Sequence, residues 1–165
     1  MSAAALLLRV LGERGETLAV AESLTGGLVL AALTDVPGSS LVLRGGVVAY
    51  AVDLKAELLG VDASLLETGG PVQAEVAAQM AAGVAAACGT TWGLATTGVA
   101  GPGPADGHPA GTVFVAFARR GTDAVVRPVD GLVARVSQGA DRGAVRAASV
   151  EAALNLALDT LTPPG

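Results

Sequence analysis

Short apolar runs alternate with helix-like patterns along the chain, which is typical of an α/β protein. Strands are expected at residues 17–21, 42–51, 92–96 and 111–118, and one or two further strands within 124–137. Helices are expected at 2–13, 28–33, 54–59, 73–87 and 140–161, with one short helical turn at 62–66. This order predicts a three-layer α/β/α sandwich with a mixed sheet whose early strands are parallel and whose later strands are antiparallel.

Turn and capping residues refine these boundaries. Asp53 is a suitable N-cap for the helix at 54–59, and Gly60 is a suitable end for it. Gly45 and Gly46 interrupt an apolar run, which predicts a bulge or a close approach of two backbones. Ligands in such sheets bind at the carboxyl ends of the strands, so the loops after Ala21, Val48 and Thr96 are candidate site segments.

Composition and charge exclude several function classes. The 165 residues are 52% hydrophobic and 15% charged, which excludes intrinsic disorder and predicts a single domain. Charged or turn residues interrupt every apolar run before it reaches a membrane-spanning length, and residues 3–8 lack the basic flank of a signal peptide. We therefore expect a cytoplasmic protein with no membrane contact. A net charge of -5 and the absence of a basic run argue against nucleic acid as a partner.

The rarest residues of the chain carry more information than the common ones. Nine of the ten basic residues are Arg and one is Lys55, and Tyr50 is the one tyrosine. A lysine can lose its proton and act as a base, whereas arginine stays charged. Lys55 is thus a candidate base, although one lysine among ten cations also arises by chance. One cysteine and one histidine cannot form a multi-cysteine or histidine-rich metal centre, so no metal or cofactor is expected.

A serine directly follows the first expected strand. If a helix begins there, the amides of Thr25, Gly26 and Gly27 are free to bind a phosphate or an oxyanion, with Ser23 as the nucleophile. Capping of the helix by Ser23 explains the same pattern without function. His108 lies in a Gly- and Pro-rich loop, so Lys55, with Tyr50 as relay or donor, is the better candidate base.

Two further segments are candidates for substrate binding. Thr97 and Gly98 begin a loop rich in backbone amides, which lacks the Gly-Lys-Ser/Thr of a phosphate loop and is equally consistent with a tight turn. Arg142 opens the last helix, where a cation opposes the helix dipole unless it has an anionic partner. That partner is either a substrate anion or a neighbouring acidic side chain.

These motifs together resemble a known family. They are, in order, residues 21–27 (Ala-Glu-Ser-Leu-Thr-Gly-Gly), 37–40 (Pro-Gly-Ser-Ser), 44–50 (Arg-Gly-Gly-Val-Val-Ala-Tyr), Lys55, 59–61 (Leu-Gly-Val), 97–102 (Thr-Gly-Val-Ala-Gly-Pro) and 111–113 (Gly-Thr-Val). The chain is similar to the C-terminal domain of the competence/damage-inducible protein CinA, which also occurs alone as nicotinamide-nucleotide amidohydrolase. The resemblance covers nearly the whole chain.

The resemblance implies an oligomeric enzyme, here expected as a homodimer, that hydrolyses nicotinamide mononucleotide to nicotinate mononucleotide and ammonia. It implies that Ser23 attacks the carboxamide carbon and that Lys55 and Tyr50 manage its proton and that of the leaving ammonia. An acyl-serine intermediate and a water molecule activated by Ser23 are both consistent with the sequence. The expected substrate-binding residues share a place in the matching motifs or in the last helix: Thr25, Gly26, Gly27, Arg44, Thr97, Gly98 and Arg142.

The chain departs from the family pattern beside the expected site. Ala51-Val52-Asp53-Leu54 stands where the family usually has Ser-Asn-Glu-Ala, so two polar side chains are replaced by apolar ones. The segment before Arg142 is one residue longer than the usual Gly-Asp-Arg. These changes keep a second hypothesis open, namely a non-catalytic nucleotide-binding or regulatory module linked to competence or DNA-damage responses.

Overall fold

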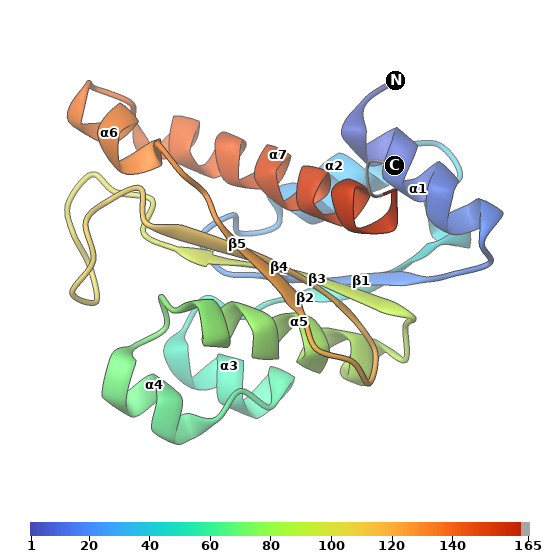
Figure 1. Cartoon of the computed structure of the whole chain (residues 1–165), viewed down its shortest axis with the longest axis horizontal. Helices are drawn as coiled ribbons and strands as arrows, with labels where there is room; N and C mark the ends of the chain where they lie inside the picture. Colours follow the sequence, from blue (N-terminus) through green and yellow to red (C-terminus); the bar gives the residue numbers. More distant parts are fainter. Residues whose placement is uncertain (163–165) are drawn as a thin grey trace.

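A mixed sheet of five strands separates two layers of helices (Figure 1). The computed structural model describes residues 1–162. The strands are β1 (Leu18–Glu22), β2 (Leu43–Val48), β3 (Trp92–Gly98), β4 (Val113–Arg119) and β5 (Val125–Pro128). The helices are α1 (Ala3–Glu13), α2 (Leu28–Thr34), the 3₁₀ turn η1 (Ser39–Leu41), α3 (Val52–Leu59), α4 (Ala63–Gly69), α5 (Ala74–Cys88), α6 (Leu132–Ser137) and α7 (Arg142–Leu161).

The strand order β2-β1-β3-β4-β5 confirms the predicted change from parallel to antiparallel pairing. β1 pairs in parallel with β2 and β3, whereas β3 with β4 and β4 with β5 are antiparallel. Helices α1, α2, α6 and α7 lie on one side of the sheet, and α3, α4 and α5 lie on the other (Figure 1). The carboxyl ends of β1, β2 and β3 therefore meet at one edge, as the sequence predicts.

The two faces of the sheet carry side chains of different size. Successive residues of a strand point to opposite faces. In β1, Leu18 and Val20 pack toward α1, α2 and α7, whereas Ala19 and Ala21 pack toward α5. The alanine- and glycine-rich face lets α5 approach closely, since a Cβ on Gly93 would lie 1.9 Å from the carbonyl oxygen of Ala81. The aliphatic, Ala-rich composition is thus used to bring α5 near the strands.

Gly45 and Gly46 show both features expected of them. The register of β1 against β2 shifts between Leu18 and Ala19, which pair with Leu43 and Gly45. A Cβ on Gly46 would lie 2.2 Å from the carbonyl oxygen of Val20. The bulge and the close approach together hold β2, and the segment that follows it, tightly against β1.

Two boundary predictions are wrong, and one helix was not predicted. The segment 124–137 holds one strand, as expected, but only at residues 125–128; α6 follows because Leu132 and Val136, four residues apart, face the core together. The strand expected at 42–51 ends at Val48. Ala51, not Asp53, is the N-cap of α3, and Asp53 lies in its first turn. No helix within residues 1–162 is long and apolar enough to cross a membrane.

Candidate active site

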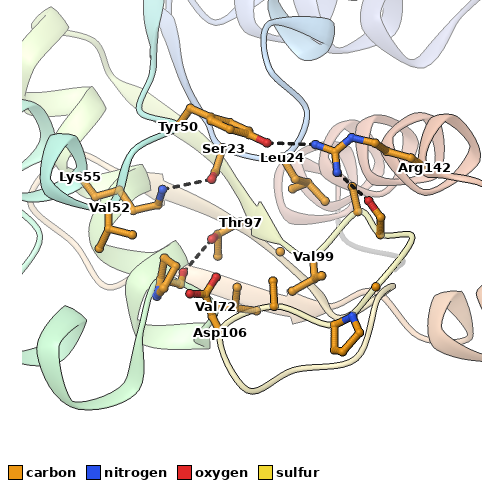
Figure 2. A pocket seen from close by; sticks show the side chains of 17 residues that line it. Ser23, Leu24, Tyr50, Val52, Lys55, Val72, Thr97, Val99, Asp106 and Arg142 are labelled. Atoms are coloured by element: carbon orange, nitrogen blue, oxygen red, sulfur yellow. Dashed lines mark hydrogen bonds between the residues drawn. The ribbon is translucent and has the colours of Figure 1, made fainter.

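A cavity of about 310 Å³ lies at the carboxyl ends of the parallel strands, between the layers of the fold (Figure 2). Its walls come from the segments after β1, β2 and β3, from the start of α3, and from the start of α7. The three loops predicted as site segments thus meet here. The polar side chains that line the cavity are Ser23, Tyr50, Lys55, Thr97, Asp106 and Arg142.

Ser23 and Lys55 are joined by a direct hydrogen bond. The Lys55 Nζ lies 3.0 Å from Ser23 Oγ and donates to the carbonyl oxygen of Ala49 at 2.7 Å. Ser23 is 8% exposed and Lys55 is fully buried. The close pairing of β2 against β1 sets this geometry, because Ser23 follows β1 while Ala49 and α3 follow β2. A serine and an amine so placed form a nucleophile–base pair once the amine is neutral.

Burial favours the neutral form of the amine. Loss of hydration lowers the pKa of Lys55 from 10.5 to about 8, and the nearby carboxylate of Asp106 opposes part of that decrease. With a pKa of about 8, roughly one-tenth of the molecules carry the neutral amine at pH 7. The lone pair of that amine is then directed to the Ser23 hydroxyl by the bond that Lys55 donates to Ala49.

Tyr50 does not join this pair. Its side chain is 60% exposed, and its hydroxyl accepts a hydrogen bond from Arg142 Nη2 at 2.9 Å (Figure 2). In the described part of the chain, no hydrogen bond links Tyr50 to Ser23 or Lys55. The expectation that Tyr50 relays the serine proton therefore does not fit the geometry. Tyr50 lies five residues before Lys55 but projects across the pocket toward α7.

Arg142 reaches the pocket from the first turn of α7. Its Nη1 donates to the carbonyl oxygen of Gly101 at 2.7 Å, and its Nη2 donates to Tyr50. Within residues 1–162 no carboxylate forms an ion pair with this guanidinium. Because both partners are neutral, the charge of Arg142 stays available to an anionic group of a ligand. The extra residue before Arg142 does not remove it from the site.

The Glu22 carboxylate binds the backbone amides at the start of α2, where the sequence predicts a substrate phosphate or an oxyanion. Its Oε2 accepts hydrogen bonds from the amides of Gly27 at 3.0 Å and Val29 at 3.1 Å, and its Oε1 accepts from Leu30 at 2.8 Å. Helix α2 begins at Leu28 rather than directly after Ser23. The Gly27 amide is therefore unavailable to substrate, and the expectation for it is corrected. Glu22 is not among the residues predicted from the sequence, although a carboxylate at the end of a fully buried strand is a signal that could have indicated it.

Of the residues that follow Ser23, Leu24 lines the cavity, whereas Thr25 is fully buried outside it with its hydroxyl 2.8 Å from that of Thr96. The Gly26 amide donates to the carbonyl oxygen of Ser23 at 3.1 Å, so it too is committed. The amides of Leu24 and Thr25 have no acceptor among residues 1–162. Arg146 Nε and Nη2 donate to the carbonyl oxygens of the same two residues at 3.0 and 2.9 Å. Glu22 and Arg146 thus hold the serine loop from its two sides.

The remaining predicted residues divide into two groups. Thr97 and Gly98 line the cavity, and the Thr97 hydroxyl donates to the carbonyl oxygen of Pro71 at 2.7 Å. Arg44 lies elsewhere, because it belongs to the first residues of β2 while Ser23 and Tyr50 lie beyond the strand ends. Its Nε donates to the carbonyl oxygen of Cys88 at 3.0 Å. The prediction that Arg44 contributes to this pocket is wrong.

Comparison of the sequence with protein families places nearly the whole chain in one family. A family profile described as the CinA C-terminal domain matches residues 1–161. The chain belongs to this family. A CinA-like protein from Frankia casuarinae is 48% identical to it over 152 residues, which make up 92% of this chain and 33% of the relative. A CinA-like protein from Gloeobacter violaceus is 46% identical over 158 residues, or 94% of this chain and 34% of the relative.

Solved CinA-family structures share the fold. A competence-damaged protein (CinA) superfamily protein from Klebsiella pneumoniae matches with a TM-score of 0.87 at 31% identity, covering 96% of this chain and 95% of that chain. The competence/damage inducible protein CihA from Agrobacterium tumefaciens matches with a TM-score of 0.83 at 32% identity, covering 98% and 96%. The chain spans about a third of the length of the two curated relatives named above. The names of these proteins describe competence and damage induction, not a reaction.

Proposed function

We propose that this CinA-family chain is an amidohydrolase that converts nicotinamide mononucleotide to nicotinate mononucleotide and ammonia. The observation that carries the proposal is the 3.0 Å hydrogen bond between Lys55 Nζ and Ser23 Oγ at the base of an open pocket. A lysine whose pKa is lowered to about 8 is a competent general base for a serine hydroxyl. The substrate follows from the family resemblance, and the arrangement of charges in the pocket suits it.

The first half of the reaction forms a covalent ester. Ser23 Oγ attacks the carboxamide carbon, and neutral Lys55 takes the hydroxyl proton as the new C–O bond forms. The carbonyl π electrons move to the oxygen, and the amide of Leu24, which lines the cavity and has no backbone acceptor within residues 1–162, is the donor that stabilises this oxyanion. When the tetrahedral intermediate collapses, the C–N bond breaks. Lys55 then returns its proton to the leaving nitrogen, which departs as ammonia.

The second half consumes water. Neutral Lys55 removes a proton from a water molecule that attacks the ester carbon, and the Leu24 amide stabilises the second oxyanion. Collapse of this intermediate breaks the bond to Ser23 Oγ, and Lys55 returns the proton to the serine. The products are the starting enzyme and the carboxylic acid, which releases its proton to solvent and leaves as the carboxylate. The protein thus uses one side chain as base and acid in both halves of the cycle.

Arg142 is the group best placed to bind the phosphate of the substrate. Its guanidinium lies at the pocket with neutral hydrogen-bond partners, Gly101 and Tyr50, and has donors that suit phosphate oxygens. Thr97 and Gly98 line the same cavity. Val52, which stands in the segment that departs from the family pattern, also lines the cavity and makes its rim more apolar.

The test is release of ammonia and nicotinate mononucleotide from nicotinamide mononucleotide by the wild-type protein. We expect both products in a ratio of about one to one, and Ser23→Ala is expected to lower the rate by 10³-fold or more. Ser137→Ala is the matched control, because this exposed serine on α6 donates only to the carbonyl oxygen of Ala134. A folded wild-type protein that binds the nucleotide without releasing ammonia would support the non-catalytic module instead.

A further inference from the structure

The charged residues that line the pocket are the carboxylate Asp106 and the cations Lys55 and Arg142. Asp106 lies at the tip of a small hairpin in which Ala105 donates to the carbonyl oxygen of His108 at 3.0 Å and His108 donates back at 2.9 Å. The φ angles of Asp106 and Gly107 are 51° and 77°. Positive values at both central residues define a tight hairpin turn that favours Asp-Gly. The turn holds the Asp106 side chain at the pocket (Figure 2).

The Asp106 carboxylate has no partner of its own. Across residues 1–162 it forms no ion pair with a basic side chain and no hydrogen bond with another side chain. It is close enough to Lys55 to oppose the decrease in the pKa of that amine. Figure 2 draws Asp106 and Arg142 on different sides of the pocket, with Thr97 between Asp106 and Ser23. The pocket therefore has a negative side at Asp106, close enough to act on Lys55 electrostatically, and a positive side at Arg142.

The substrate class proposed above has the complementary arrangement. When its carboxamide carbon lies at Ser23 Oγ, the aromatic ring that bears the carboxamide lies beside the Ser23–Lys55 pair. In a nicotinamide nucleotide the ring nitrogen is quaternary and carries one positive charge, while the phosphate lies beyond the ribose. A carboxylate beside the ring and a guanidinium at the phosphate match both charges.

We propose that Asp106 is a specificity-determining residue, which selects carboxamides on a cationic ring over the same carboxamides on a neutral ring. This inference rests on the proposed function and deepens it, since it concerns the same pocket. The interaction acts on binding of the ring, so it is separate from the proton transfers of Lys55. If Asp106 acted on Lys55 alone, its removal would change the handling of cationic and neutral rings equally.

A pair of ligands that differ in ring charge tests the inference. Nicotinamide mononucleotide has a cationic ring, and its reduced, dihydropyridine form has a neutral ring with the same carboxamide, ribose and phosphate. We would measure the Kd of both by calorimetry in a Ser23→Ala background, where no turnover interferes. Asp106→Asn keeps the size of the side chain, and asparagine tolerates the positive φ of the turn. Asp123→Asn is the matched control, because Asp123 is exposed in the β4–β5 turn.

We expect Asp106→Asn to weaken binding of the oxidised nucleotide by about fivefold and to change binding of the reduced form by less than about twofold. Asp123→Asn is expected to change neither. Equal effects of Asp106→Asn on both nucleotides, no effect on either, or no binding of either to the parent variant would overturn the inference. Ammonia release by the wild-type protein reports separately on the proposed function, so the two can fail independently.

Discussion

Lys55 combines full burial with two hydrogen bonds, one to the serine hydroxyl and one to the carbonyl oxygen of Ala49. Arginine at the same place would carry a permanent charge and could not accept the Ser23 proton. The chain uses arginine at all nine of its other basic positions. The proposed role of Lys55 as a base is consistent with this difference, because it requires an amine that can lose its proton.

Tyr50 is expected to act through Arg142. Tyr50→Phe removes the hydroxyl that accepts from Arg142 Nη2 but leaves the Ser23–Lys55 bond intact. We expect KM for nicotinamide mononucleotide to rise about three- to tenfold, while kcat changes less than about twofold. Steady-state kinetics of both proteins, with circular dichroism to verify folding, measure this. A 100-fold loss of kcat with unchanged KM would instead assign Tyr50 to proton transfer.

Glu22 is expected to hold the serine loop. Glu22→Gln replaces one carboxylate oxygen by an NH₂ group that faces a backbone amide of α2, so at least one buried donor loses its acceptor. We expect the free energy of unfolding, measured with urea, to fall by about 2–3 kcal/mol. Glu13→Gln is the control, since its exposed pair with Arg9 contributes about 0.5 kcal/mol or less. Equal losses in the two variants would refute this role.

Residue chemistry could be predicted from the sequence where rarity or position marked it. Ser23 follows a buried strand and Lys55 is the one lysine, so the sequence predicts both as candidate site residues. Glu22 is not predicted, because its role depends on how far the chain turns between β1 and α2. Arg44 was misplaced because the direction of β2 relative to the pocket is a tertiary property. The sequence marks Asp106 only as part of a turn. That its carboxylate lines the pocket without an ion-pair partner within residues 1–162 follows only from the three-dimensional structure.

At the scale of elements, the close pairing of β1 and β2 positions both members of the Ser23–Lys55 pair. Gly46→Ala would place a Cβ 2.2 Å from the carbonyl oxygen of Val20 and 3.1 Å from Leu30. We expect this variant to lose about 1–3 kcal/mol of unfolding free energy, because β2 must move away from β1. Ammonia release should fall with it, since Ala49 and Lys55 follow β2.

Gly12→Ala is the control for that variant. Gly12 lies within α1, and an added Cβ would lie 3.5 Å from Val42, which is ordinary van der Waals contact. Alanine is favoured over glycine inside a helix by about 1 kcal/mol, so we expect this substitution to stabilise the protein. Urea unfolding of the two variants should therefore show opposite signs. The same sign for both would mean that the close contact of Gly46 does not determine the β1–β2 pairing.

Most elements lie close to their predicted bounds, and the segment 124–137 is the clearest exception. The long helix α5 and strands β1 and β4 lie within about two residues of their predicted bounds. The segment 124–137 contains alternating apolar residues that fit a strand or a short helix equally. Its second half forms α6 because Leu132 and Val136 pack against the core from one face of a helix. Tertiary packing, and not the local sequence pattern, determines this structure.

At the scale of the molecule, the pocket gathers residues that lie more than a hundred positions apart. Ser23 and Arg142 come from opposite parts of the chain, and Asp106 comes from the connection between β3 and β4. The alternation of elements predicts a mixed sheet, but the order β2-β1-β3-β4-β5 depends on long-range pairing that leaves no local signal. The sequence therefore predicts that the loops after the parallel strands meet at one edge of the sheet. It does not predict that the start of α7 joins them there.

Burial of the Lys55 amine should make the free energy of unfolding of the whole protein depend on pH. The pKa of Lys55 is 10.5 in the unfolded chain and about 8 in the folded protein, so below pH 8 the folded state holds a buried ammonium. Between pH 8 and 10.5 the folded state releases this proton before the unfolded state does, and wild-type stability rises relative to a variant without the group. We expect Lys55→Met to be more stable than wild type at pH 7, with a smaller difference at pH 9.5.

Urea unfolding of wild type and Lys55→Met at both pH values measures this difference. Other titrating groups are common to the two proteins and cancel in the comparison. A stability difference that is the same at both pH values would show that the pKa of Lys55 is not lowered on folding. If Lys55→Met is more stable than wild type but inactive, the buried amine lowers stability and is required for activity.

The most direct measurement is the pH dependence of kcat/KM for ammonia release from nicotinamide mononucleotide by wild type and Lys55→Arg, from pH 6 to 9.5. For the wild type we expect kcat/KM to rise about tenfold per pH unit and to level off above the Lys55 pKa of about 8. Lys55→Arg, which keeps the charge and removes the base, should be at least about 10²-fold slower and lack this rise. Wild-type rates and an unchanged pH profile in Lys55→Arg would contradict the assignment of Lys55 as the base for Ser23.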